Sequence, residues 1–370
     1  TRCSRDWSSD VCSSDLLGSG TTTVGDQSAA VGFQTTAEGD QSLALGYQSK
    51  AVADHSVALG YQTTASGQDS LAMGTSSSTT ANGVGAVAMG DSAVADNVQA
   101  FSLGANTLAA GSQSFAMGSN TKATADQAFA LGSNTLAAGT AAVAMGSGSE
   151  SNGDAALAAG TTTWANGTNS LAAGLSTAAL GDQSVAFGSS STALGANSLA
   201  IGESANTTAA AVDSLAVGLY AQTTAAYSLA VGNEAVAAGD YSASIGSNTV
   251  SGGVGSLAVG INTQAVAPYS FALGNTTVAN GMNSFALGDG STTSAYGTSS
   301  MAVGQGASTA GSYSLAVGSN AQTSQTGLGA ASIGTSTIAN GAYSLAVGDS
   351  ANTQDTALYS FSLGLSTSTG

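Results

Sequence analysis

A five-residue phrase recurs along this chain, and its spacing constrains the fold more than any other feature. The phrase is a small residue, an apolar residue, a small residue, an apolar residue and glycine, as in Ser42–Gly46 and Ser344–Gly348. It occurs 24 times, its closing glycines run from Gly32 to Gly364, and 18 of the 23 intervals are 14 residues while 5 are 16. A unit this short cannot bury its own hydrophobic face, so neighbouring units must stack. The sequence predicts a solenoid.

A single repeat, residues 105–118, indicates the form of each coil. It contains a polar pair, the segment Thr107–Gly111, a second polar pair and the segment Ser114–Gly118. Five residues are too few for an ordinary helix, which needs about 10–12, so we expect two five-residue strands joined by two tight turns. Side chains alternate along a strand, which puts positions 1, 3 and 5 of both strands on the inside. Only Ser, Thr, Ala and Gly occur there in this repeat. The prediction is an all-β, parallel β-solenoid with a narrow interior.

The repeats of 16 residues should carry their two extra residues in a turn, because insertion there moves no packed position. We expect all five insertions in the turn that follows the closing glycine, at Thr75–Ser78, Glu203–Asn206, Asp289–Thr292, Ser319–Gln322 and Asp349–Asn352. The only proline, Pro268, falls in the other turn, where it removes no ladder hydrogen bond.

The two apolar positions of the Ser-containing strand should point out of the coil. All 48 are apolar, 43 are larger than alanine, and none is charged. Outward positions of the other strand are mixed, as at Glu38, Lys50 and Thr64, which predicts a solvated face. An exposed apolar stripe of this size marks an interface, so the sequence predicts a homo-oligomer bundled around the stripe. The predicted interface residues are Leu43, Leu45, Leu71, Met73, Phe115, Met117, Leu199, Ile201, Leu215, Val217, Leu229, Val231, Phe271, Leu273, Leu315, Val317, Leu345 and Val347.

The phrase Ser-Leu-Ala-Val-Gly on a 14-residue period resembles the head-domain repeats of trimeric autotransporter adhesins of Gram-negative bacteria, the Yersinia-adhesin type, throughout residues 17–370. The resemblance implies a left-handed parallel β-roll and a trimeric rod, in which the partners are two further copies of the chain. It also implies multivalent attachment to host cells, extracellular matrix or glycan surfaces. The implied location is extracellular, at the bacterial cell surface, with an outer-membrane anchor in a C-terminal region outside this sequence.

Residues 1–16 lack the repeat and resemble the translation of a common short-read sequencing adapter. We therefore interpret them as a non-native segment and residues 17–370 as a single head domain truncated at both ends. That domain has no Cys, no Arg, two Lys and a net charge of −16. Such acidity without a basic patch argues against nucleic acid and anionic membrane surfaces. No run of 18 apolar residues occurs, so we expect no membrane insertion by this segment.

Two polar ladders follow from the period. Asp26, Asp40 and Asp54 occupy the same turn of successive coils and should stack about 4.8 Å apart. They would form either a Ca²⁺ site, if backbone oxygens completed the shell, or a hydrated acidic rim, which we favour. A second ladder, interpreted as structural, consists of Asn106, Asn120 and Asn134.

The single histidine, His55, lies in a turn beside Asp54, and a catalytic dyad would need a nucleophile and a pocket. We expect a solvated histidine, no catalytic, cofactor or metal site, and no enzyme activity. Trp164 and Tyr296 should project from the mixed face, where an exposed aromatic residue either anchors a partner or is exposed by chance. Alternative functions are a trimeric phage tail-fibre shaft and an ice-binding or structural solenoid. A self-cleaving chaperone domain downstream would indicate the fibre, and the irregular outward threonines argue against ice binding.

Overall fold

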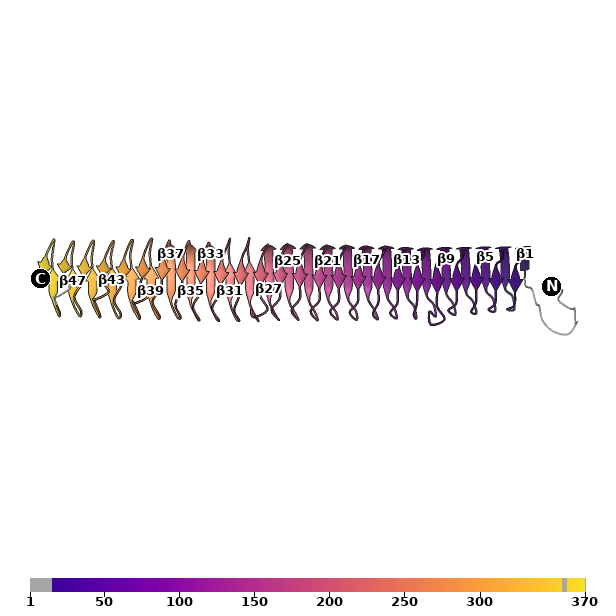
Figure 1. Cartoon of the computed structure of the whole chain (residues 1–370), viewed down its shortest axis with the longest axis horizontal. Coiled ribbons are helices and arrows are strands. Elements are labelled where there is room, and N and C mark those ends of the chain that lie inside the picture. The colour runs from indigo at the N-terminus through magenta and orange to yellow at the C-terminus, as the bar shows by residue number, and fades with distance from the viewer. Residues whose placement is uncertain (1–14, 355–357, 370) are drawn as a thin grey trace, which may run out of the picture. The chain divides into compact units, whose positions relative to one another are not determined.

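The computed structural model describes residues 15–354 and 358–369, and these residues form strands and turns without any helix. They belong to two compact units, Thr1–Ala179 (unit 1) and Leu180–Gly370 (unit 2). Each coil contributes one longer strand, which carries the outward apolar residues, and one two-residue strand. The described residues of unit 1 form 12 such coils and those of unit 2 form 13. Within each unit the coils follow one another in chain order (Figure 1).

The longer strands of unit 1 carry odd numbers. They are β1 (Asp15–Ser19), β3 (Ala29–Phe33), β5 (Leu43–Tyr47), β7 (Val57–Tyr61), β9 (Leu71–Thr75), β11 (Val87–Asp91), β13 (Phe101–Ala105), β15 (Phe115–Ser119), β17 (Phe129–Ser133), β19 (Val143–Ser147), β21 (Leu157–Thr161) and β23 (Leu171–Leu175). The short strands are β2 (Thr22–Thr23), β4 (Thr36–Ala37), β6 (Lys50–Ala51), β8 (Thr64–Ala65), β10 (Ser78–Thr79), β12 (Val94–Ala95), β14 (Leu108–Ala109), β16 (Lys122–Ala123), β18 (Leu136–Ala137), β20 (Glu150–Ser151), β22 (Trp164–Ala165) and β24 (Ala178–Ala179).

Unit 2 continues the same alternation. Its longer strands are β25 (Val185–Ser189), β27 (Leu199–Glu203), β29 (Leu215–Val217), β31 (Leu229–Val231), β33 (Ala243–Ser247), β35 (Leu257–Ile261), β37 (Phe271–Asn275), β39 (Phe285–Leu287), β41 (Met301–Val303), β43 (Leu315–Val317), β45 (Ala331–Ile333), β47 (Leu345–Val347) and β49 (Phe361–Leu363). The short strands are β26 (Thr192–Ala193), β28 (Asn206–Thr207), β30 (Gln222–Thr223), β32 (Val236–Ala237), β34 (Val250–Ser251), β36 (Gln264–Ala265), β38 (Val278–Ala279), β40 (Thr292–Thr293), β42 (Ser308–Thr309), β44 (Gln322–Thr323), β46 (Ile338–Ala339), β48 (Asn352–Thr353) and β50 (Ser368–Thr369).

Pairing is parallel and in register from one coil to the next. Strand β5 pairs with β7, so that Gly46 lies beside Gly60. On the other side of the same coils β6 pairs with β8, with Lys50 beside Thr64. Equivalent residues therefore form columns within each unit, as in a stacked repeat protein. The predicted parallel β-solenoid with 14-residue coils is confirmed.

The interior between the two strands of a coil is as narrow as the sequence predicts. Ala44, Ala51 and Ser49 are fully buried, and the largest fully buried side chains in the described chain are threonines, such as Thr63. A Leu or Phe has no room between the two strands. The core of each unit is therefore a set of small-residue columns, and the larger apolar residues must lie elsewhere.

The strands differ from the two five-residue strands that the repeat predicts: the longer strand has five or three residues and the other has two. The longer strand begins after the serine and extends to the residue past the glycine, as in β5, or stops before the glycine, as in β29. The serine lies in the turn, and in some coils its hydroxyl bonds to the turn backbone; Ser56 Oγ, for instance, donates to the carbonyl of Ala53 at 2.6 Å. The second strand keeps only two ladder residues because a coil of 14 residues must reverse direction twice.

The position predicted for the insertions is wrong. The turn between β9 and β10 has the same length as the turn between β7 and β8, and the extra residues of this coil follow β10. The same holds in the other four long coils, where the segments after β28, β40, β44 and β48 are the longer ones. The physical reason is that Ser and Thr fit the interior equally well. A register shift of two residues keeps every side chain on the same face, so composition alone does not select the correct one.

Both turns of a coil place a non-glycine residue in the left-handed region. Examples are Gln41 (φ 56°) in one turn and Gln48 (φ 52°) in the other. Their amides continue the inter-coil ladder, since Gln41 N–H donates to the carbonyl of Asp26 and Gln48 N–H to that of Phe33, each at 2.8 Å. The conformation costs energy in an L-residue, and the stacked backbone compensates for it by satisfying the amide.

This geometry predicts a stabilising substitution. Thr162 is β-branched and has a φ of 53°, whereas asparagine tolerates this conformation well. Thr162→Asn is expected to raise the free energy of unfolding by about 1 kcal/mol, measured by denaturant titration. Thr64→Asn, on a strand, is the matched control and should give no gain. A loss of stability in Thr162→Asn would contradict this account of the turn.

Strand pairing begins inside the N-terminal segment that the sequence analysis interprets as non-native. Strand β1 begins at Asp15, and Leu16 pairs with Ala30 while Gly18 pairs with Gly32. Strand pairing uses backbone groups, so it extends two residues into the segment predicted to be non-native. The rest of that segment, residues 1–14, lies outside the described residues.

Candidate subunit interface

The predicted interface residues lie on the outside of the coils. In β5, Leu43 and Leu45 flank the fully buried Ala44, and Leu45 exposes 42% of its surface. None of the eighteen predicted residues is buried, and Phe271 is exposed to 40%. Because pairing is in register, these residues form two parallel columns in each unit, which we call the apolar stripe: the first and third residues of the longer strands from β3 to β49. The structure thus brings them together on one face.

Aromatic members of the apolar stripe stack on one another. The rings of Phe101 and Phe115 have centroids 4.9 Å apart and planes 2° apart, and the rings of Phe115 and Phe129 are 4.9 Å and 5° apart. Stacking of this kind adds to the stabilisation from burial alone. The three rings therefore form one continuous apolar surface along the stripe.

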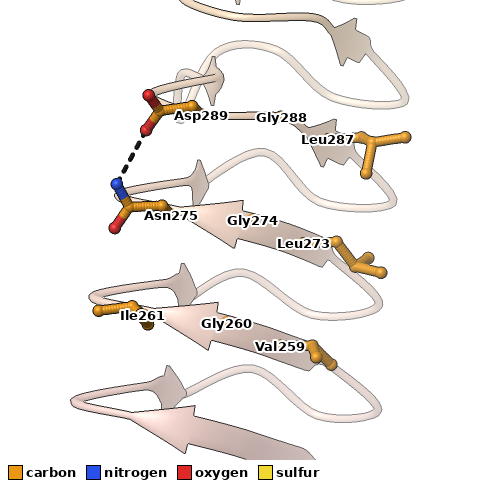
Figure 2. A pocket seen from close by; sticks show the side chains of 9 residues that line it. All are labelled: Val259, Gly260, Ile261, Leu273, Gly274, Asn275, Leu287, Gly288 and Asp289. Atoms are coloured by element: carbon orange, nitrogen blue, oxygen red, sulfur yellow. Dashed lines mark hydrogen bonds between the residues drawn. The ribbon is translucent and has the colours of Figure 1, made fainter.

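A groove of ≈ 440 Å³ runs beside the stripe where the closing glycines stack. Figure 2 shows Val259, Leu273 and Leu287 on one side of the glycines and Asn275 and Asp289 on the other. Asn275 Nδ2 donates to Asp289 Oδ1 at 3.0 Å, so a hydrogen bond joins the two polar side chains at this edge of the groove. The groove exists because glycine has no side chain to fill it, and its lining is almost entirely apolar.

The opposite face is mixed in character. Lys50 and Glu38 form an ion pair of 3.0 Å with both side chains partly solvated, and such surface pairs contribute little to stability. Trp164 is half-buried on β22, as an outward residue of a short strand should be. Tyr296, predicted on this face, is instead in the turn between β40 and β41 and is 65% exposed. The error follows from the misplaced insertion in this coil.

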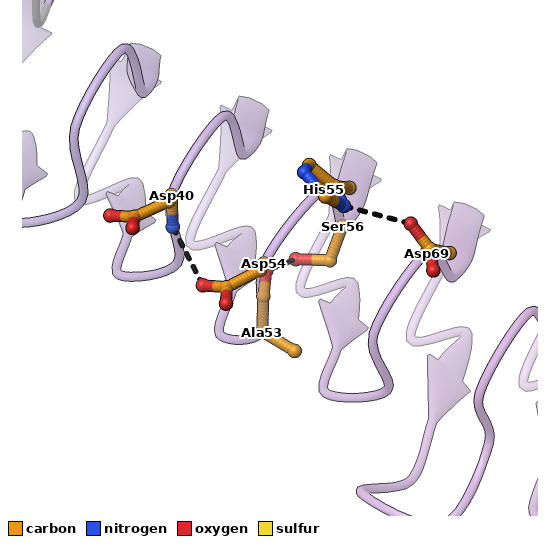
Figure 3. A network of polar contacts seen from close by, with 6 residues as sticks. All are labelled: Asp40, Ala53, Asp54, His55, Ser56 and Asp69. Carbon is orange, nitrogen blue, oxygen red and sulfur yellow. Dashed lines mark hydrogen bonds and ion pairs between the residues drawn. The ribbon is translucent and has the colours of Figure 1, made fainter.

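The aspartate ladder of unit 1 is bonded to the backbone. Asp26 N–H donates to Asp40 Oδ1 at 2.8 Å. Asp40 N–H donates in the same way to Asp54 Oδ1 at 2.9 Å (Figure 3). Each carboxylate therefore satisfies a turn amide in the preceding coil. No group of three His, Cys, Asp or Glu side chains suited to a metal ion occurs among residues 15–354 and 358–369. The hydrogen bonds from Asp26 and Asp40 N–H give the ladder a structural role.

His55 has a partner in the following coil. Its Nδ1 lies 2.9 Å from Asp69 Oδ1, and both side chains are about half exposed (Figure 3). The adjacent Ser56 uses its hydroxyl on the Ala53 carbonyl. This arrangement is a solvated contact between two turns.

Amide ladders extend further than the sequence analysis identified. Asn120 Nδ2 donates to Asn134 Oδ1 at 2.6 Å, as predicted for this turn. In the same turn nearer the N-terminus, Gln48 and Gln62 each donate to the glutamine one coil earlier, at 2.8 and 3.0 Å. The signal was present in the sequence as Gln34, Gln48 and Gln62 at 14-residue spacing. These ladders link the turns of successive coils.

A parallel solenoid with a small-residue core and an outward apolar stripe defines a class of repeat protein whose largest apolar surface lies outside its own coils. A comparison with models of known families also identifies a repeat protein. The model for the YadA head domain repeat, which holds two copies of the repeat, matches a series of stretches from residues 24–49 to residues 295–321, many of which overlap. These cover well over half of the chain, and the chain belongs to this family. No curated protein matches it. In the part of the chain that the structure describes, no helix is long and apolar enough to cross a membrane.

Proposed function

We propose that this chain is the head segment of a trimeric autotransporter adhesin, in which three copies pack around their apolar stripes and present a repetitive outer face for attachment to surfaces. The head repeat and the solenoid support an adhesive or structural role in place of an enzymatic one. The proposal requires no catalytic residue and no cofactor.

The observation that carries the proposal is the apolar stripe. Its side chains are half-buried or exposed in one chain, although all are apolar and most are larger than alanine. Fully burying a large apolar side chain contributes roughly 1.5–3 kcal/mol, and the stripe repeats this in every coil. Membership of the family favours two further copies of the chain as the partners that cover the stripe. The groove along the closing glycines has room for side chains of a neighbouring copy.

The outer face then consists of the short strands and both sets of turns. It is acidic and polar, with a net charge of −17 over the whole sequence. We propose attachment to host cells, extracellular matrix or glycans by many weak contacts, which three identical faces would strengthen through effective concentration. The proposed location is the outer surface of a Gram-negative bacterium, with an outer-membrane anchor supplied by another part of the protein.

Assembly is tested with a variant in which the three stacked phenylalanines are replaced by aspartate. We expect the wild-type chain to sediment as a trimer at micromolar concentration. Replacing Phe101, Phe115 and Phe129 together by Asp removes three large apolar contacts per chain, so dissociation should begin at concentrations about a thousandfold higher. Sedimentation across a dilution series measures the shift.

The matched control places the same charges on the other face. Val94, Leu108 and Leu136 are half-buried outward residues of β12, β14 and β18, and their triple Asp variant should sediment as the wild type does. A stable, soluble wild-type monomer would contradict the proposed interface.

Adhesion is tested separately with beads coated with the trimer. Attachment to cultured cells, matrix or immobilised glycans is expected to exceed that of beads coated with the dissociated triple Asp variant. A trimer that attaches to none of these surfaces would leave the assembly in place and exclude the adhesive role.

A further inference from the structure

Unit 2 carries tyrosines in the turn that precedes the longer strand, and four of them form two stacked pairs. The rings of Tyr227 and Tyr241 have centroids 4.9 Å apart and planes 5° apart. Those of Tyr343 and Tyr359 have centroids 5.4 Å apart and planes 10° apart. The second tyrosine of each pair lies one coil after the first, and all four side chains are 52–77% exposed. Each pair therefore holds two phenol rings face to face and open to solvent.

The backbone keeps the two members of each pair in register. Tyr241 N–H donates to the carbonyl of Ala226, the residue before Tyr227, at 3.0 Å. Tyr359 N–H donates in the same way to the carbonyl of Ala342 at 3.1 Å. These bonds hold the paired tyrosines one strand spacing apart, about 4.8 Å. Rotation about the side-chain bonds of the exposed rings is then enough to bring their edges together.

Two other tyrosines in the same turn have no tyrosine in an adjacent coil. Tyr269 lies between coils that carry Gly255 and Asn283 at this position. Tyr313 is likewise isolated, with serine on one side and glycine on the other. These two side chains are 56% and 69% exposed, so they are as accessible as the pairs. They differ from the pairs only in lacking a second phenol within reach, which makes them an internal comparison.

A third stacked pair lies in a different place. Tyr47 and Tyr61 are the last residues of β5 and β7, with ring centroids 4.9 Å apart and planes 6° apart. Those strands carry the apolar stripe, so access to this pair depends on the proposed trimer. The inference is therefore confined to the two pairs in the turns of unit 2, which lie outside the stripe.

No disulfide can join one coil to the next within the repeats, because residues 17–370 contain no cysteine. Neighbouring coils are held by backbone hydrogen bonds and by the packing of small residues. Two phenols are another combination of side chains that can be joined covalently, by oxidation. Holding two reacting groups side by side strongly favours such a step over the same reaction between separate molecules.

The joining reaction is the coupling of two phenoxyl radicals. Each phenol loses one electron and one proton, and the unpaired electron is shared with the Cε carbons beside the oxygen. One Cε of each ring then forms the new carbon–carbon bond. Each bonded carbon loses its hydrogen as a proton and each oxygen regains one, which restores both phenols. A haem peroxidase carries out the one-electron steps, and hydrogen peroxide takes up the two electrons and two protons and becomes two molecules of water.

We propose that Tyr227–Tyr241 and Tyr343–Tyr359 are sites of oxidative cross-linking, at which hydrogen peroxide and a haem peroxidase convert each stacked pair to dityrosine and link two neighbouring coils. The linked residues are 14 and 16 positions apart in the chain. Closing a loop of this size restricts the unfolded chain, as a disulfide does. The inference does not depend on the proposed adhesive role.

The experiment treats the full chain with hydrogen peroxide and a plant haem peroxidase. An aspartate-specific endopeptidase then cuts between the tyrosines of each pair, at Asp240 and at Asp349. We expect dityrosine fluorescence and two cross-linked peptides, each lighter by two hydrogen atoms than its two parts. Tandem mass spectrometry should place the links at the two pairs, at least about tenfold more abundant than any link at Tyr269 or Tyr313.

Matched variants test the role of the stack. Tyr241→Phe/Tyr359→Phe keeps both rings but removes the oxygen that a phenoxyl radical requires, so both links should disappear. Asn283→Tyr places a phenol in the coil after Tyr269 and should create a new link there. After the peroxidase treatment, the wild type should unfold in denaturant at least about tenfold more slowly than the double phenylalanine variant, whereas the untreated proteins should unfold alike.

Four outcomes would contradict the inference. Links at Tyr269 or Tyr313 as abundant as those at the pairs would mean that exposure, and not stacking, decides the coupling. Cross-linked peptides that combine light and heavy isotope copies, mixed before refolding, would show coupling between chains. Absence of dityrosine from the treated wild type would exclude the modification. Equal unfolding rates of the treated wild type and the treated phenylalanine variant would mean that no link holds the coils together.

Discussion

Gly132→Ala is expected to lower the free energy of unfolding by at least about 3 kcal/mol. The φ of Gly132 is 136°, a conformation that L-residues rarely adopt, and a Cβ added there would overlap the carbonyl oxygen of Gly146 in the next coil. That oxygen is part of the backbone, so it cannot move aside without disturbing the ladder. Denaturant titration at fixed protein concentration measures the loss, since an oligomer's stability depends on concentration.

The matched control is Gly139→Ala. A Cβ there would also meet backbone, at the carbonyl of Gly153, but the φ of Gly139 is not in the positive region. The equivalent residue one coil earlier is Ala125, so the coil accommodates alanine at this position. We expect less than half of the Gly132→Ala effect. Equal losses would mean that crowding, and not backbone conformation, explains the closing glycines.

Ala216→Leu should also destabilise strongly. Ala216 is fully buried and lies in the ladder between Ala200 and Ala230. Three added carbons would have to fit an interior filled by Ala, Ser and Thr, and overpacking costs roughly 1–3 kcal/mol or more. Thr64→Leu, on the mixed outward face, should stay within about 0.5 kcal/mol of the wild type. Thermal or denaturant unfolding distinguishes the two, and equal stabilities would reverse the assignment of inside and outside.

The faces of the longer strands could be predicted from sequence because a residue larger than alanine occupies 43 of the 48 outward positions, and the inner positions hold only small residues. At Leu43, Ala44 and Leu45 a shift of one residue would put leucines into a space that holds only alanine. The register of the short strands was harder to predict from the sequence. Around Ser77 and Thr79 the sequence offers several small polar residues, and only the pairing of Thr79 with Ala65 fixes the register.

The left-handed turn residues were also beyond sequence reasoning. Gln41 and Tyr227 are not types that favour a positive φ, and the stacked backbone imposes it. A signal existed in the glycines that share their column, Gly85, Gly255 and Gly329. Comparing the same turn position across successive repeats would have identified the positive φ.

Backbone pairing in register has a consequence for how such a protein changes over generations. Each coil is held by the coil before it and the coil after it, so a unit has no central region on which every part depends. Gain or loss of one 14-residue coil within a unit would preserve both columns of the stripe and alter the height of the displayed surface by about 4.8 Å. Gain or loss of a coil therefore changes the height of the displayed surface and the stability of the unit in steps of one coil. A substitution at an outer position can occur in any one coil without changing the others.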